Sequence, residues 1–147
     1  MAILEILQED GRLSVSEVGR RVGLSQPATS ERIKRLEERG IIGGYCARIN
    51  PQALGLAMQA LLRLRTTHEN IPRALQLFAE TPEIVNVDRV TGEDCFVLRV
   101  IVPRPVDLER IVDTIARLGP VTTAVVLRQQ RAKPISRQLM RSTGTME

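Results

Sequence analysis

Residues 25–35, with the sequence SQPATSERIKR, carry the amide, hydroxyl and cationic groups that proteins use to contact DNA. The apolar spacing predicts a helix whose buried stripe is formed by Thr29, Ile33 and Leu36. That stripe turns Gln26 and Ser30 outward, near the start of the helix. A glutamine side chain can bind adenine through two hydrogen bonds, and a serine hydroxyl can bond to several bases. These two residues are therefore candidates for reading a DNA sequence.

The cationic residues of the same helix are better suited to the phosphate backbone. Arg32, Lys34 and Arg35 could bind phosphates, which set position rather than sequence, and the free amides at the helix N-terminus also favour an anion. Glu31 opposes this interpretation unless it accepts a hydrogen bond from cytosine or pairs with Arg35 one turn later. The DNA-contacting set that we predict comprises Ser25, Gln26, Ala28, Thr29, Ser30, Glu31, Arg32, Lys34 and Arg35.

The same helix, taken alone, is more typical of a solvated surface helix. The segments before it change that balance. A first helix is predicted at residues 2–9, and a second follows Ser14, which fits a capping box with Glu17. Gly23 ends the second helix, and Ser25 can cap the third.

Residues 41–50, IIGGYCARIN, place β-branched residues around a Gly-Gly pair and predict a small β-hairpin, or wing. Three helices followed by a wing form a winged helix-turn-helix domain, here residues 1–49. In such a domain the third helix enters the major groove of DNA. This arrangement makes DNA binding the better interpretation of residues 25–35.

Net charge is weak evidence for that interpretation. The chain of 147 residues has a formal charge of +4, but residues 1–50 hold eight Lys or Arg against seven Asp or Glu. Residues 51–130 hold nine of each sign, and residues 131–147 hold four against one, so most of the excess lies in the last segment. Three aromatic residues are too few for a surface that stacks on bases. The argument for DNA therefore depends on the placement of side chains.

Other kinds of site have little support in the sequence. The two cysteines, Cys46 and Cys95, are far apart and the chain has one histidine, so we expect no metal and no cofactor. No apolar run reaches the roughly 18 residues that span a bilayer, and the first residues do not resemble a signal peptide. We therefore expect a cytoplasmic protein with no membrane partner.

A second domain is predicted after a linker at residues 50–56. Residues 57–131 show the order strand, helix, strand, strand, helix, strand, which indicates an α+β ferredoxin-like βαββαβ domain. The predicted strands cover residues 57–67, 84–91, 95–102 and 121–131, and the predicted helices cover 71–80 and 105–119. Residues 132–147 are expected to form a mobile C-terminal tail.

Both faces of the predicted sheet are apolar. In residues 95–102 one face carries Phe96, Leu98, Val100 and Val102, and Arg99 is the only polar residue of the other. Two helices can cover only one of these faces. We therefore expect the second face to pack on another subunit, most simply in a two-fold dimer.

The chain strongly resembles the Lrp/AsnC (feast/famine) transcriptional regulators. The resemblance rests on Asp10-Gly11-Arg12, Val22-Gly23-Leu24-Ser25, the run at residues 32–37, Gly40-Ile41-Ile42 and Asn50-Pro51, and it continues to residue 131 through VTGEDCFVLRV. It implies a DNA-binding domain joined to an effector-binding and oligomerising domain. It also implies homodimers, often assembled into octamers, and amino acids as effectors.

The resemblance suggests an effector site at the hairpin after residue 90. We predict a site formed by Thr91, Gly92, Glu93, Asp94, Cys95, Val121, Thr122 and Thr123. Glu93 or Asp94 could bind an ammonium group, and the Gly92 amide could bind a carboxylate. Cys95 stands where the family commonly has an acid, so the usual effector class is in question. An ordinary β-turn would also explain residues 91–94.

The start of the chain is a second departure from the family. Family members usually have a few more residues before the first helix, which suggests a shortened or misassigned start at Met1. Siroheme decarboxylases share this two-domain architecture, but their chemistry would want histidines or an aromatic-lined basic pocket, and His68 is the only histidine. An effector-binding module with a vestigial DNA head is a third possibility, which the intact run at residues 32–37 disfavours.

Overall fold

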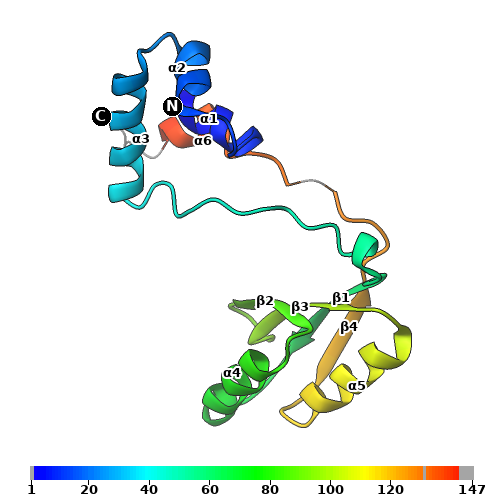
Figure 1. The fold of residues 1–147 in the computed structure, drawn as a ribbon. Coiled ribbons are helices and arrows are strands. Elements are labelled where there is room, and N and C mark those ends of the chain that lie inside the picture. Colours follow the sequence, from blue (N-terminus) through cyan, green and yellow to red (C-terminus); the bar gives the residue numbers. More distant parts are fainter. Residues whose placement is uncertain (1, 131, 143–147) are drawn as a thin grey trace. The chain divides into compact units, whose positions relative to one another are not determined.

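The computed structural model describes residues 2–130 and 132–142, and the chain divides into two compact units. The first unit contains residues 1–48 and 131–147, and the second contains residues 49–130. Figure 1 shows helices alone in the first unit and a sheet with two helices in the second.

Three helices of the first unit lie where the sequence predicts them. They are α1 (Ala2–Glu9), α2 (Val15–Val22) and α3 (Gln26–Glu38). Ser14 caps α2, because its hydroxyl accepts a hydrogen bond from the Glu17 amide at 3.2 Å. The reciprocal half of the predicted capping box is replaced, since the Glu17 carboxylate binds Arg20 and Arg21 instead. The charge-assisted hydrogen bonds from these two arginines lower the pKa of Glu17 to about 2.

The turn between α2 and α3 depends on two glycines. Gly23 has a φ of 71°, the left-handed conformation that favours glycine at the end of a helix. Gly19 allows close packing, because a Cβ there would lie 2.7 Å from Thr29 Oγ1 and 2.8 Å from the Leu24 carbonyl oxygen. Thr29 is fully buried and donates its hydroxyl proton to the Ser25 carbonyl at 2.9 Å. These contacts fix the orientation of α3 against α2.

The prediction of a β-hairpin at residues 41–50 was wrong, since this segment contains no strand. Gly43 and Gly44 interrupt the β-branched residues, and the segment instead makes a side-chain contact with α3. The Tyr45 hydroxyl donates to the Glu37 carboxylate at 3.0 Å. Partial burial, and then the nearby Glu37 carboxylate, raise the pKa of Tyr45. A tertiary contact of one side chain therefore replaces the expected strand pairing.

The C-terminal tail also differs from the prediction. Residues 137–142 form a short helix, α6 (Arg137–Ser142), which belongs to the first unit. The Ser136 hydroxyl accepts a hydrogen bond from the Leu139 amide at 3.3 Å, as a helix cap does. The sequence of this segment has too short an apolar pattern to predict a helix.

The second unit has the predicted ferredoxin-like order. Its elements are β1 (Met58–Leu64), α4 (Ile71–Glu80), β2 (Ile84–Arg89), β3 (Phe96–Val102), α5 (Pro105–Ala116) and β4 (Val121–Val125), with short 3-10 turns at Gln52–Leu54 and His68–Asn70. The sheet order is β2-β3-β1-β4, and every neighbouring pair is antiparallel. Both α4 and α5 cover the same face of the sheet (Figure 1).

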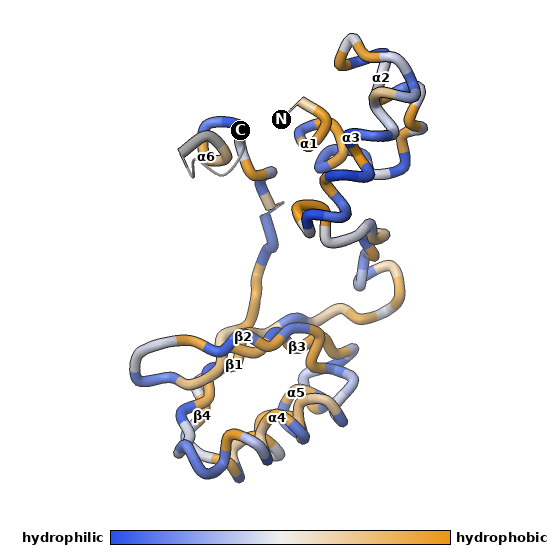
Figure 2. Tube along the Cα trace, turned by 90° about the vertical axis from the view of Figure 1, so that its left-hand side faces the viewer, coloured by the Kyte–Doolittle hydropathy of each residue, from blue (hydrophilic) through white to orange (hydrophobic). Residues whose placement is uncertain are grey.

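The core of the second unit lies between that face and the helices. Leu62 on β1 is paired with Leu98 on β3 and Thr123 on β4, and both leucines are fully buried. Phe78 of α4 meets Phe96 edge to face, with ring centroids 5.3 Å apart. The trace in Figure 2 is largely hydrophobic through β1 and β3. The predicted alternation of β3 is confirmed, and Ala60, Leu62 and Leu64 of β1 are buried on the same side of the sheet.

Two details of this unit were predicted incorrectly. The apolar spacing of residues 71–80 predicts Leu75 on the buried side of α4, but Leu75 is 46% exposed and Leu77 packs against the core in its place. Strand β4 ends at Val125 instead of continuing to residue 131. The pairing of β4 with β1 ends at a hydrogen bond from the Val126 amide to the Gln59 carbonyl, 2.8 Å long. Gln59 is close to the start of β1. Without a partner strand, later residues leave the sheet, and Leu127 is 97% exposed.

Candidate DNA-contacting helix and effector site

Helix α3 begins as the sequence predicts. The Ser25 hydroxyl accepts a hydrogen bond from the Ala28 amide at 3.4 Å, and Pro27 lies in the first turn, where no amide proton is needed. Most of the predicted DNA-contacting residues are exposed: Ser25, Gln26, Ser30, Glu31, Arg32, Lys34 and Arg35. Ala28 is half-buried. Thr29 is fully buried, so its side chain cannot reach DNA and its inclusion in that set was wrong.

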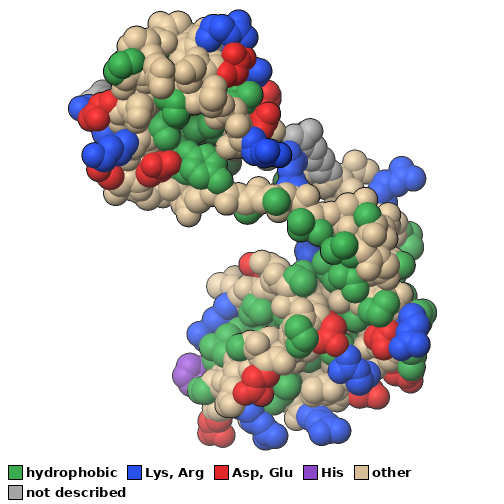
Figure 3. All heavy atoms as spheres, in the orientation of Figure 1, with side chains coloured by type: hydrophobic (Ala, Val, Ile, Leu, Met, Phe, Trp, Pro, Cys, Tyr) green, Lys and Arg blue, Asp and Glu red, His purple; other side chains and the backbone are tan. Residues whose placement is uncertain are grey.

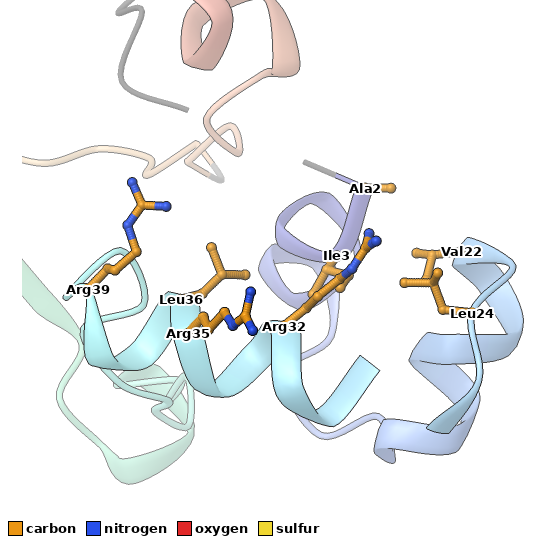
Figure 4. Close-up of a pocket in the computed structure, with 8 residues that line it drawn as sticks. All are labelled: Ala2, Ile3, Val22, Leu24, Arg32, Arg35, Leu36 and Arg39. Atoms are coloured by element: carbon orange, nitrogen blue, oxygen red, sulfur yellow. The ribbon is translucent and has the colours of Figure 1, made fainter. Parts of the chain in front are cut away.

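The exposed residues form two rows along the helix. Gln26, Ser30 and Lys34 are four residues apart and share one side. Arg32, Arg35 and Arg39, the last at the C-cap, follow the other side. Figure 4 shows these arginines beside Ile3 and Leu36, around an open hollow of about 270 Å³. One row thus begins with neutral hydrogen-bonding groups, and the other row is cationic throughout.

Ion pairs distinguish the cations from one another. Arg35 is bound to Glu31 at 2.9 Å, the pairing that the sequence suggests, and Lys34 lies 3.7 Å from Glu38. Within the described residues, Arg32 has neither an ion pair nor a hydrogen-bonding partner for its side chain. Acidic and basic side chains lie close to one another around the edge of the visible face of this unit (Figure 3). Arg32 is therefore the most readily available cation of α3.

Sequence reasoning missed Arg39 as part of this surface. Its spacing of seven residues from Arg32 is the signal, since residues seven apart lie on the same side of a helix. Its position at the C-cap, one residue beyond Glu38, obscured the pattern.

The predicted effector residues come from two distant segments that the fold brings to one end of the sheet. Residues 91–94 connect β2 to β3, and residues 121–123 open β4. Both segments flank the end of β1: the Cys95 amide donates to the Leu64 carbonyl at 2.8 Å, and Leu64 is paired with Val121. The β1 strand lies between the two groups of residues.

The acids of this site already have cationic partners. Asp94 lies 3.8 Å from Arg63, and Glu93 forms an ion pair with Arg65. The Cys95 thiol donates to the Thr66 carbonyl at 3.1 Å and accepts from the Thr66 amide at 3.5 Å. Arg63 and Arg65 were missed from the sequence, because only the fold brings the end of β1 beside the turn. An incoming ammonium group would compete with two guanidinium groups for these carboxylates.

The described residues contain no group of three or more potential metal ligands. No helix in the described part of the chain is long and apolar enough to cross a membrane. The single histidine, His68, is exposed in the second 3-10 turn.

Comparison with known proteins identifies the family. Residues 1–42 match the family model described as winged helix-turn-helix DNA-binding, and residues 59–134 match the Lrp/AsnC ligand binding domain. The chain belongs to the Lrp/AsnC family of transcriptional regulators. It is 33% identical over 138 residues to the HTH-type transcriptional regulator YezC of Bacillus subtilis. The aligned region covers 91% of this chain and 95% of YezC.

Solved Lrp/AsnC structures have the same fold. Bacillus subtilis LrpC superposes with a TM-score of 0.83 at 27% identity, covering 89% of this chain and 94% of LrpC. The NMB0573 regulator of Neisseria meningitidis, in complex with L-methionine, has a TM-score of 0.81 at 26% identity, covering 94% and 96% of the two chains. These similarities confirm the α+β architecture and the family that the sequence indicated.

Proposed function

We propose that this chain is a cytoplasmic, sequence-specific DNA-binding regulator in which α3 enters the major groove. The supporting observation is the exposed row of Gln26, Ser30 and Lys34 on a helix that buried Thr29 fixes against α2. Gln26 is the first residue of α3, the end that most often meets base edges. Gln26 and Ser30 would read bases, and Lys34 would contact phosphate.

Arg32 and Arg35 would contribute phosphate contacts from the other row. Arg32 can bind phosphate without leaving another partner. Arg35 would first have to give up Glu31, so its net contribution should be smaller. We therefore rank Arg32 above Arg35 as a phosphate ligand.

The regulator would act as a homodimer, with octamers as the larger assembly. The support is the sheet face that α4 and α5 leave uncovered, where Leu61, Val97 and Ile101 are only half-buried. Burying this face against a second copy removes apolar surface from water and gives a two-fold arrangement. Two α3 helices could then enter successive major grooves, roughly 34 Å apart.

The effector would be an amino acid bound at the end of β1. The related NMB0573 structure contains L-methionine, which makes this compound the first one to test. Residues 91–95 and 121–123 would line the site, with Glu93 or Asp94 taking the ammonium group. The arginine paired with that acid, Arg65 or Arg63, would then be released and could receive the carboxylate.

A regulatory role has more support than a siroheme-decarboxylase-like enzyme. The exposed position of His68 offers no enclosed acid or base. The relatives and structures compared above are transcriptional regulators. A spectral shift on adding a tetrapyrrole would favour the enzyme.

DNA binding can be tested with the duplex upstream of the chain's own gene. Fluorescence anisotropy should show binding that weakens steeply with salt and is much tighter for this duplex than for a scrambled one. Equal affinity for both duplexes would contradict sequence-specific regulation.

Effector binding can be tested by thermal shift with the individual amino acids. A ligand that binds only the native state raises the melting temperature, and the stabilisation grows with the logarithm of its concentration relative to Kd. Glu93→Ala and Asp94→Ala should each reduce that increase, whereas Glu69→Ala, in the turn beside His68, should not. No shift with any amino acid, L-methionine included, would contradict this part of the proposal.

A further inference from the structure

The C-terminal segment is held on the first helix of the same unit. The Gln8 side chain makes two hydrogen bonds to the backbone of Ile135: Nε2 donates to the carbonyl at 3.1 Å, and Oε1 accepts from the amide at 2.7 Å. Arg137 forms an ion pair with Glu5 at 2.6 Å. Because Glu5 and Gln8 are three residues apart, they lie on one side of α1 and act together.

Charge also favours this contact. Residues 2–10 carry three acids and no base, whereas residues 131–141 carry four bases and no acid. Opposite net charges attract the two segments, although each exposed ion pair alone contributes little. The bidentate Gln8 contact adds geometric selectivity, because it requires both backbone groups of one residue.

The first unit has a small core, so contacts from an additional helix should stabilise it. Within its described residues, only Ile3, Leu4 and Val18 are buried apolar side chains, and a domain of about 50 residues has little core to spare. The Arg137 ion pair joins α6 to Glu5 of α1, and α1 also contributes Ile3 beside Leu36 of α3. A contact that steadies α1 therefore supports the helix that is proposed to read DNA.

The connection to the second unit gives this contact a further role. Residues 126–134 join β4, a wall of the proposed effector site, to the segment that binds α1. The linker at residues 50–56 lies on the other covalent route between the units. We propose that residues 135–140 are a docking segment for α1, and that docking makes a second connection between the effector-binding and DNA-binding units.

The predicted consequence is a restriction on the DNA-binding unit. A unit held by two connections loses less freedom when it binds DNA than a unit held by one. Release of the docking segment should therefore weaken binding to the duplex. This consequence rests on the proposed DNA-binding function, whereas the docking itself does not.

Amide hydrogen exchange of the full chain tests the docking. Gln8→Ala should accelerate exchange of the Ile135 amide about fivefold or more, because its acceptor is removed. Glu5→Arg and Arg137→Glu should each accelerate exchange across residues 135–140, and the double variant should restore slow exchange. Gln138→Ala, an exposed glutamine of α6, is the matched control and should change little. Unchanged exchange in Gln8→Ala, or no restoration in the double variant, would overturn the docking.

Anisotropy with the upstream duplex tests the consequence. Gln8→Ala should raise Kd about threefold to tenfold, and Gln138→Ala should not. An unchanged Kd in a variant whose segment is released would overturn the role of the second connection. A wild-type chain that selects no duplex would overturn the proposed function and the affinity effect together, and the exchange data would still judge the docking.

Discussion

The two units reach a fixed structure by different means. The second unit has thirteen buried apolar residues between its sheet and helices, whereas the described part of the first unit has three. The first unit depends instead on caps, on the close approach at Gly19 and on side-chain contacts such as Tyr45 to Glu37. A thin core leaves most of α3 exposed, which a DNA-reading helix requires. The comparison suggests that the second unit provides most of the stability and the first unit provides the contact surface.

The largest effect should follow from Gly119→Ala in the second unit. A Cβ at this position would lie 2.1 Å from the Arg65 carbonyl oxygen, and the φ of 146° is strained for alanine. The steric clash and the backbone strain together should destabilise the unit by about 3 kcal/mol or more. Urea unfolding followed by hydrogen exchange should show the loss in β1 and β4, with the first unit little changed. A loss shared equally by both units would contradict their independence.

The second effect in size should follow from Gly19→Ala in the first unit. The added Cβ would press on the Leu24 carbonyl and on Thr29, at a cost of about 1–3 kcal/mol. Because this unit has a thin core, we expect it to unfold first, with loss of DNA binding. Gly43→Ala is the control, since a Cβ there meets nothing within 4 Å. Full DNA binding by Gly19→Ala would contradict the claim that this contact fixes α3.

The third comparison separates the two rows of α3. Gln26→Ala with Ser30→Ala should reduce the preference for the specific duplex by about tenfold, because base contacts are lost. Arg32→Ala should weaken specific and scrambled duplexes alike and reduce the slope of log Kd against log salt by about one. Titrations at several salt concentrations measure both effects. The assignment of roles is wrong if both variants behave identically.

The smallest effect should come from Glu17. Its pKa in the folded chain is about 2, below the ordinary 4.5, so it contributes stability above pH 4.5 that is lost as the pH falls toward 2. Glu17→Gln should therefore flatten the dependence of stability on pH in that window. Glu9→Gln offers a control at an exposed acid of α1. Urea unfolding by circular dichroism between pH 2 and 5 would measure the difference, and equal slopes in wild type and Glu17→Gln would refute it.

The features that could be predicted from the sequence are those with a local or periodic signal. Strand β1 was predictable because its alternation directly reflects burial on one face, from Ala60 to Leu64. The caps Ser14 and Ser25 were predictable because their signals are local. The contact of Tyr45 with α3, the pairing of Arg63 with Asp94 and the docking of Ile135 on Gln8 depend on tertiary proximity. None of these leaves a periodic signal in the sequence.

The central claim is that the outward row of α3 reads a DNA sequence. The most direct measurement is the ratio of Kd for a scrambled duplex to Kd for the upstream duplex, at one salt concentration, for wild type and for Gln26→Ala with Ser30→Ala. We predict a large ratio for wild type and a ratio about tenfold smaller for the variant, with little change in affinity for the scrambled duplex. A ratio near one for wild type, or an unchanged ratio in the variant, would contradict the account.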